Sequence, residues 1–155
     1  MLRPPNFLAL ALLAALAPAG MPAEAERTAY ARVDIAPSTT SIYIGTVSLT
    51  LEPLVRQEST YEARYVAKVF PYFFSNEAGR LRVELSNEQL RTLARGESVE
   101  FKGHGVRDDG TERRVAGKAI PNDSHSGRLK VRVFVSPETE LIFNTTYRFS
   151  EKPET

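Results

Sequence analysis

Two histidines are the only side chains of this 155-residue chain whose ordinary pKa lies close to neutral pH. His104 lies between Gly103 and Gly105, and these glycines could let a ligand or another backbone approach closely. A general base or a metal ligand is therefore one interpretation of His104. We favour the other, a solvent-side histidine in a twisted, glycine-rich strand.

The second histidine, His125, lies in the run Asn-Asp-Ser-His-Ser-Gly over residues 122–127. The run holds the residue types of a hydrolase triad. Such a triad needs the serine to hydrogen-bond the histidine while the acid orients it, a geometry that neighbours in one loop rarely achieve. Because the same residues are typical of turns, we favour a turn. Either histidine could join a nearby aspartate at a metal ion, but no spacing requires it, so we expect no metal and no cofactor.

No other catalytic motif is present, so we expect a protein that is not an enzyme. The chain lacks the GxSxG, P-loop, HExxH and GxGxxG patterns. It has no cysteine, which excludes disulfides, thiolate metal sites and a cysteine nucleophile. Its 20 Lys and Arg against 19 Asp and Glu give a net charge of +1, and so no electrostatic reason to expect nucleic acid.

Two groups of residues remain as candidates for binding. Arg128, Lys130 and Arg132 alternate along one expected strand and therefore share one face, where phosphate, a glycan or a lipid head group could dock. Three further cations on the neighbouring hairpin could extend this basic stripe: Arg113, Arg114 and Lys118. A solvated face is the alternative that we favour for the stripe.

The other candidate is the aromatic cluster Phe70, Tyr72, Phe73 and Phe74. Consecutive strand residues point to opposite faces, so these four side chains cannot all enter one core. We favour packing against the core and the helix, with any exposed remainder available as a docking patch.

The amino-terminal segment has the layout of a secretory signal peptide. Arg3 precedes an eleven-residue apolar run, Phe7 to Ala17, which is shorter than the roughly 20 residues of a membrane-spanning helix. Small residues then offer cleavage sites after Ala19 or Ala25. Small eukaryotic secreted domains tend to be rich in cysteine, so we expect export in a bacterium, to the periplasm or outside the cell. No membrane span is expected in the mature chain.

The expected elements are those of a mainly β domain. We expect strands over residues 41–52, 60–70 and 81–85, two later hairpins, and one short helix over residues 87–95 that caps at Ser86 and covers an open end. The first hairpin should pair Val99 with Ala119, and the second Val133 with Phe143. The expected division is a signal peptide over 1–25, a poorly ordered segment over 26–40, one β domain over 41–149 and a flexible tail over 150–155.

About seven or eight short antiparallel strands fit a β-sandwich or a small, partly open β-barrel, and alternation alone does not separate the two. The first function we expect is a non-enzymatic binding or interaction module whose partner is an unknown envelope protein, glycan or lipid. The main alternative is a barrel that carries a lipid or another apolar molecule. A hydrolase is a weaker alternative. The run Leu141 to Phe149 also resembles the terminal strand signal of outer-membrane β-barrel proteins, although the chain continues beyond it.

Overall fold

The computed structural model describes residues 29–151. The expected signal peptide and the last four residues of the expected tail lie outside this range. None of the described helices has the length and apolar character needed to cross a membrane.

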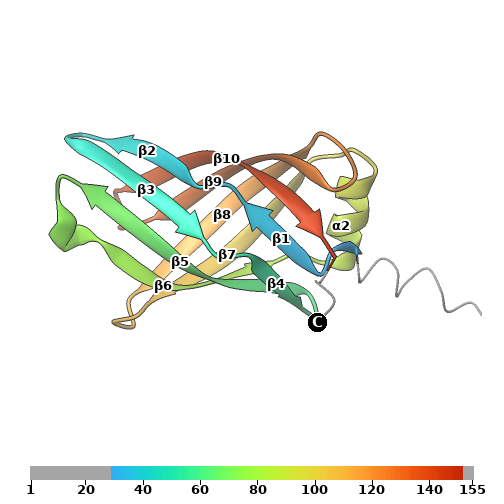
Figure 1. The fold of residues 1–155 in the computed structure, drawn as a ribbon, viewed down its shortest axis with the longest axis horizontal. Helices are drawn as coiled ribbons and strands as arrows, with labels where there is room; N and C mark the ends of the chain where they lie inside the picture. Colours follow the sequence, from blue (N-terminus) through green and yellow to red (C-terminus); the bar gives the residue numbers. More distant parts are fainter. Residues whose placement is uncertain (1–28, 152–155) are drawn as a thin grey trace, which may run out of the picture.

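The described chain is built almost entirely from strands (Figure 1). In chain order the elements are β1 (Arg32–Ile35), β2 (Ser38–Ile42), β3 (Gly45–Leu51), β4 (Leu54–Gln57), β5 (Thr60–Phe70), the 3-10 helix η1 (Phe73–Ser75), β6 (Glu77–Glu84), α2 (Asn87–Ala94), β7 (Val99–Arg107), β8 (Glu112–Pro121), β9 (Ser126–Phe134) and β10 (Glu140–Ser150).

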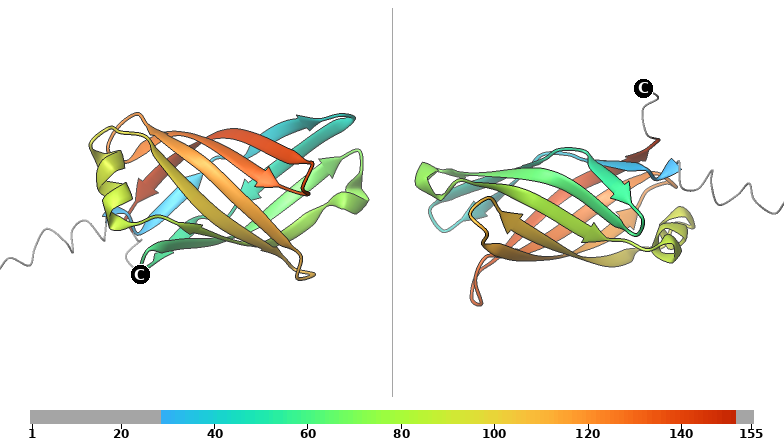
Figure 2. Two further views of the ribbon diagram at one scale, coloured as in Figure 1. Left: turned by 180° about the vertical axis from the view of Figure 1, so that it is seen from behind. Right: turned by 90° about the horizontal axis from the view of Figure 1, so that it is seen from below.

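The strands form one antiparallel sheet that closes on itself as a barrel. The order β5-β4-β1-β10-β9-β8-β7-β6 is completed by pairing between β6 and β5, so eight strands make a ring. Strands β2 and β3 pair with each other and extend the wall beyond β1 and β4 (Figures 1 and 2). This confirms the mainly β class with one short helix, and it selects the barrel over the sandwich.

Two prolines explain why β1 and β4 are short. Pro37 separates β1 from β2, and Pro53 separates β3 from β4. Proline has no N–H for a ladder bond, so each strand is interrupted there. The chain nevertheless stays against its neighbours, because Ala36 N–H donates to the Thr146 carbonyl and Glu52 N–H to the Arg64 carbonyl.

The segment over residues 26–40, expected to be poorly ordered, contains β1 and most of β2. Val33 is buried in β1 and pairs with both Phe149 and Leu54, so this strand joins β10 to β4 and completes the ring. The strand expected over residues 41–52 is instead a hairpin that turns just before Gly45. Gly45 has φ of 127°, which favours glycine, and a Cβ there would collide with the Phe70 carbonyl.

One expected hairpin register is confirmed and the other is wrong. Val99 faces Ala119 across β7 and β8, as expected. Phe143, however, faces Val131 and not Val133. The turn between β9 and β10 is centred one residue earlier than expected, with Val135 N–H bonded to the Thr139 carbonyl, so the partners shift by two residues. A shift of two residues keeps each side chain on its face, so the apolar pattern could not reveal it.

Helix α2 covers one end of the barrel, which we call the closed end (Figure 2). The Ser86 side chain accepts from Gln89 N–H while the Gln89 side chain accepts from Ser86 N–H, which is the expected capping box. Leu90 and Leu93 point into the core from the buried face of the helix. The opposite end carries the β2–β3, β5–β6, β7–β8 and β9–β10 connections, and we call it the open end.

The interior is packed unevenly along the barrel. The main core contains, among the described residues, twelve buried side chains, including Leu90 and Leu93 of α2 and the aromatic rings of Tyr61 and Phe149. A second cluster has only three buried members: Val47, Ala67 and Phe143. Partly buried aliphatic residues surround that smaller cluster.

Candidate functional site

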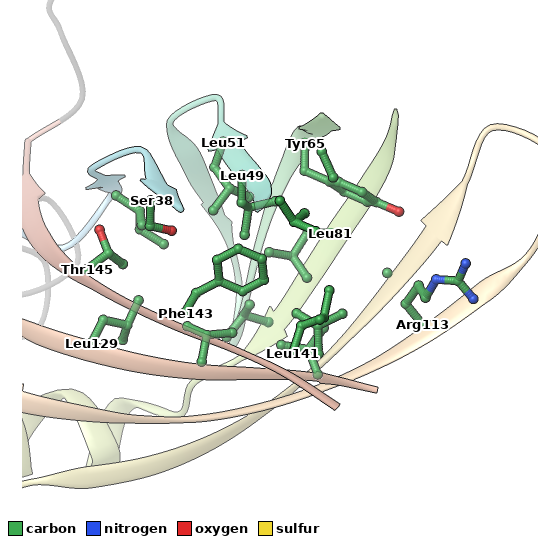
Figure 3. Close-up of a pocket in the computed structure, with 18 of the residues that line it drawn as sticks. Ser38, Leu49, Leu51, Tyr65, Leu81, Arg113, Leu129, Leu141, Phe143 and Thr145 are labelled. Carbon is green, nitrogen blue, oxygen red and sulfur yellow. The ribbon is translucent and has the colours of Figure 1, made fainter. Parts of the chain in front are cut away.

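An apolar cavity of about 590 Å³ lies inside the barrel (Figure 3). Its volume is within the range of about 300–1,000 Å³ found for small-molecule sites. Inward-facing aliphatic and aromatic side chains supply most of the wall, among them Leu49, Leu51, Leu81, Leu129, Leu141 and Phe143. These six come from β3, β6, β9 and β10, so only closure of the barrel brings them together.

Large side chains form the floor of the cavity near the closed end. Leu93 of α2 lines it together with Tyr61 and Phe149. Tyr61 donates from its hydroxyl to the Tyr30 carbonyl at 2.6 Å, and burial raises the pKa of this phenol strongly. The Tyr147 and Phe149 rings meet edge to face with centroids 5.5 Å apart. These contacts fix the floor by packing and by a satisfied buried hydroxyl.

A compact polar group interrupts the apolar wall near the open end. Glu77 of β6, Arg107 of β7, Arg113 of β8 and Tyr65 of β5 all line the cavity. Glu77 Oε2 lies 3.2 Å from Arg113 Nη2 and 3.4 Å from Arg107 Nε. Its other oxygen accepts from the Tyr65 hydroxyl at 3.1 Å. We call these four residues the polar cluster, in which one carboxylate holds two guanidinium groups and a phenol.

The position of Tyr65 depends on a neighbouring glycine. Tyr65 pairs with Gly79 across β5 and β6, and a Cβ on Gly79 would lie 2.9 Å from Tyr65 Cε1. The missing side chain lets the phenol lie along the wall and reach Glu77. Burial, followed by the charge of Glu77, raises the pKa of Tyr65 to about 12, so the hydroxyl stays protonated and donates at neutral pH.

Arg113 is the least satisfied member of the polar cluster. Its side chain is only 13% exposed. Nη1 donates to the Val135 carbonyl at 3.3 Å, but Nε is buried with no hydrogen-bond partner, the one such side-chain atom found in residues 29–151. Figure 3 shows Arg113 and the Tyr65 hydroxyl on the side of the cavity away from Leu129 and Thr145.

The aromatic cluster expected from the sequence is divided by the structure. Tyr72 and Phe74 line the cavity, and their rings meet with centroids 5.7 Å apart. Phe70 and Phe73 pack edge to face on each other and are 61% and 65% exposed. None of the four contacts α2, which lies at the other end of the barrel. Together with Tyr43 and Ile44 they give the open end an apolar rim.

The basic stripe lies on the outer surface. Arg128, Lys130 and Arg132 are exposed, while the residues between them in β9 face inward. Lys130 pairs with Lys118 of β8, and Arg132 bonds Glu140 at 3.4 Å. Arg114 stacks over Phe134 at 4.2 Å on the same outer side. Arg113 does not extend the stripe as expected, because its side chain points inward to the polar cluster.

The two histidines lie apart and build no common site. His104 is on the outer face of β7, 3.5 Å from Glu112 and across from Arg82 and Arg114. His125 stacks on Tyr30, and its Nδ1 lies 2.7 Å from Ser124 Oγ. Within residues 29–151, no three histidine or acidic side chains gather in a way that could hold a metal ion.

Asp123 serves the turn and does not orient the His125 ring. One of its oxygens accepts from the His125 and Ser126 N–H groups, and the other accepts from the Ser126 hydroxyl. These bonds lower the pKa of Asp123. The residues at 122–127 therefore make a hydrogen-bonded turn that closes β8 onto β9.

Sequence reasoning missed the polar cluster, although a signal was present. Arg113 has the same parity as Val115 and Ala119, which are buried in the barrel, and Glu77 has the parity of Leu81. Alternation alone therefore places both charges inside the barrel. No protein-family model matches this chain, and no curated protein or solved structure matches it either.

Proposed function

We propose that this protein is a non-enzymatic carrier that binds one apolar or amphipathic molecule inside its barrel. The apolar cavity of about 590 Å³ is the observation that carries the proposal. Eight-stranded barrels are just wide enough either to be filled by side chains or to hold one small ligand. Here the closed end is filled and the rest of the interior is not, as the two core clusters demonstrate.

The distribution of charge supports an interior site over an outer-membrane barrel. Outward positions of β6 and β9 carry exposed Arg80, Arg82, Arg128 and Lys130. An arginine or lysine that faces lipid near the bilayer midplane costs about 2–4 kcal/mol. The same two strands line the cavity with apolar side chains instead: Leu81, Val83, Leu129 and Val131. Export to a bacterial periplasm, inferred from the amino-terminal segment, is part of the same proposal, and an interaction role for the basic stripe remains a prediction.

Binding of a neutral fluorescent probe tests the proposal directly. N-phenyl-1-naphthylamine, which brightens in apolar surroundings, should bind the mature protein saturably with one site. Leu141→Trp places an indole in the cavity wall and should weaken binding about tenfold, the loss of roughly 1.4 kcal/mol of apolar contact.

Ile142→Trp is the matched control for this experiment. Ile142 is the next residue along β10 but faces outward, opposite Arg132. It therefore receives the same added bulk without touching the cavity, and probe affinity should stay at the wild-type value. Absence of saturable binding to the wild type, or equal losses in the two variants, would overturn the proposal. In a separate experiment, native mass spectrometry of protein purified from a bacterial periplasm would identify any ligand that co-purifies.

A further inference from the structure

We propose that the ligand is an amphipathic molecule with an anionic head group, and that Arg113 holds this head group at the open end of the cavity. The inference rests on the proposed carrier function and adds the chemical class and the orientation of the ligand. It follows from where the polar cluster lies, from its charge and from one unsatisfied donor.

The location of the polar cluster sets the orientation. Arg113 and Arg107 lie next to the β7–β8 turn, and Glu77 begins β6 directly after η1. All three are therefore at the open end, while the floor is formed by Leu93, Tyr61 and Phe149 at the other end. A ligand with one polar end and one apolar end buries its chain toward α2 and leaves its head group beside the cluster.

The charge of the polar cluster selects an anion. Among the residues that line the cavity, two guanidinium groups face one carboxylate, Glu77. Arg107 has a second acidic neighbour, Asp109, at 3.5 Å, but Asp109 is on the exposed turn and does not line the cavity. Within residues 29–151, Glu77 is the acid that Arg113 bonds. The surplus positive charge on the cavity side thus belongs to Arg113.

The hydrogen bonds of the polar cluster point to the same ligand class. Guanidinium groups only donate, and the Tyr65 hydroxyl already donates its proton to Glu77, so the donors left for a ligand in this cluster are those of the arginines. The buried Nε of Arg113 has no acceptor in the described chain. A carboxylate or phosphate oxygen could accept from Arg113, and charge-assisted bonds of this kind are about twice as strong as neutral ones.

A head-group series separates this inference from the carrier function. Decanoate, 1-decanol and decyltrimethylammonium share one alkyl chain and differ in charge, and each is used to displace N-phenyl-1-naphthylamine at about pH 8, where the carboxylic acid is ionised. Decanoate should bind the wild type about tenfold more tightly than 1-decanol, as expected for one charged hydrogen-bonded pair. Decyltrimethylammonium should bind most weakly.

Two variants should move the decanoate-to-decanol affinity ratio in opposite directions. Arg113→Met keeps an apolar stem and removes the charge, so the ratio should fall about tenfold. Glu77→Gln removes the competing carboxylate and should raise the ratio several-fold. Arg80→Met, on the exposed outer face of β6, is the matched control and should leave the ratio unchanged. Because a merely unfolded variant cannot raise the ratio, Glu77→Gln keeps the test decisive.

Each result has one meaning. Equal affinity for decanoate and 1-decanol, or a ratio unaffected by Arg113→Met and Glu77→Gln, overturns the anionic head group but leaves the carrier function standing. Tighter binding of decyltrimethylammonium than of decanoate overturns it too and assigns recognition to Glu77. If the probe binds but no alkyl ligand displaces it, the amphipathic ligand class is overturned, and if the probe itself does not bind, the carrier function fails.

Discussion

Strands β5 to β10 run through both ends of this barrel, yet the two ends are packed differently. At the closed end, α2 adds Leu90 and Leu93 to a core that also contains Tyr61 and Phe149. At the open end the described residues place no α-helix over the interior, and the buried members of the local cluster are Val47, Ala67 and Phe143. The cavity occupies the space that side chains leave unfilled.

The comparison indicates that the closed end serves the stability of the fold and that the open end serves binding. Burial of apolar surface contributes about 25 cal/mol per Å² of area removed from water, so the closed end should supply more of the folding free energy. The open end keeps apolar surface unburied and exposes Phe70, Phe73 and Phe74 on its rim. Such surface becomes useful when a ligand covers it.

Truncation of one leucine at each end should give the largest difference in the free energy of unfolding. Leu93→Ala removes a side chain that is 1% exposed, and it should cost about 2–5 kcal/mol of unfolding free energy because nearly all of its surface is packed in the main core. Leu141→Ala should cost about 1–2 kcal/mol, since Leu141 is only partly buried and loses fewer contacts. Urea denaturation measures both values.

Each leucine variant is the control for the other, because the same Leu→Ala change is made at both sites. A constant slope of free energy against urea would show that neither variant alters the extent of unfolding. Equal costs at the two ends, or a larger cost for Leu141→Ala, would contradict the uneven packing.

A helix cap tests the closed end with a smaller effect. Ser86→Ala removes one half of the capping box and should lower the free energy of unfolding by about 1 kcal/mol. Ser41→Ala in β2 is the control at the open end, since Ser41 is exposed and its side chain makes no hydrogen bond in the structure. Urea denaturation should distinguish the two. If Ser41→Ala and Ser86→Ala lower the free energy of unfolding equally, the capping box does not stabilise the protein beyond an ordinary exposed serine.

Two tyrosines, one near each end, should give the smallest effect at neutral pH. Burial, then the charge of Glu77, raises the pKa of Tyr65 to about 12, and burial, then Asp123, raises that of Tyr147 to about 12. An unfolded tyrosine ionises near about pH 10, so this stabilising contribution is complete below that pH and is lost as the pH rises toward 12.

Removing either phenol should make the alkaline loss of stability less steep. Tyr65→Phe and Tyr147→Phe are each compared with the wild type by urea denaturation at several pH values above about 10. Decanoate should steepen the alkaline loss in the wild type and in Tyr147→Phe but not in Tyr65→Phe, because its charge would lie beside Tyr65. An alkaline loss in both variants that equals that of the wild type would contradict the assigned burial.

Much of the fold could be predicted from local patterns. The strand over residues 60–70, the capped helix and the register of β7 with β8 depend on neighbours in sequence, and all three are confirmed. The register of β9 with β10 failed because a slip of two residues preserves the pattern of faces. Strand β1 lies in a segment that we expected to be poorly ordered, because its partner in β10, Phe149, is more than a hundred residues away.

Alternation in a strand fixes the face of each residue once one of them is known, so inward and outward positions can be read from the sequence. On this basis Arg113 shares the inner face with Val115, although we expected it to extend the basic stripe, and Arg128 shares the outer face with Lys130. The closure of the sheet between β5 and β6, and the filling of one end by α2, are visible only in the folded chain. The polar cluster likewise exists only after closure, because Glu77, Arg107 and Arg113 come from three separate strands. Closure is a long-range property of twist, shear and strand number, and no local pattern encodes it.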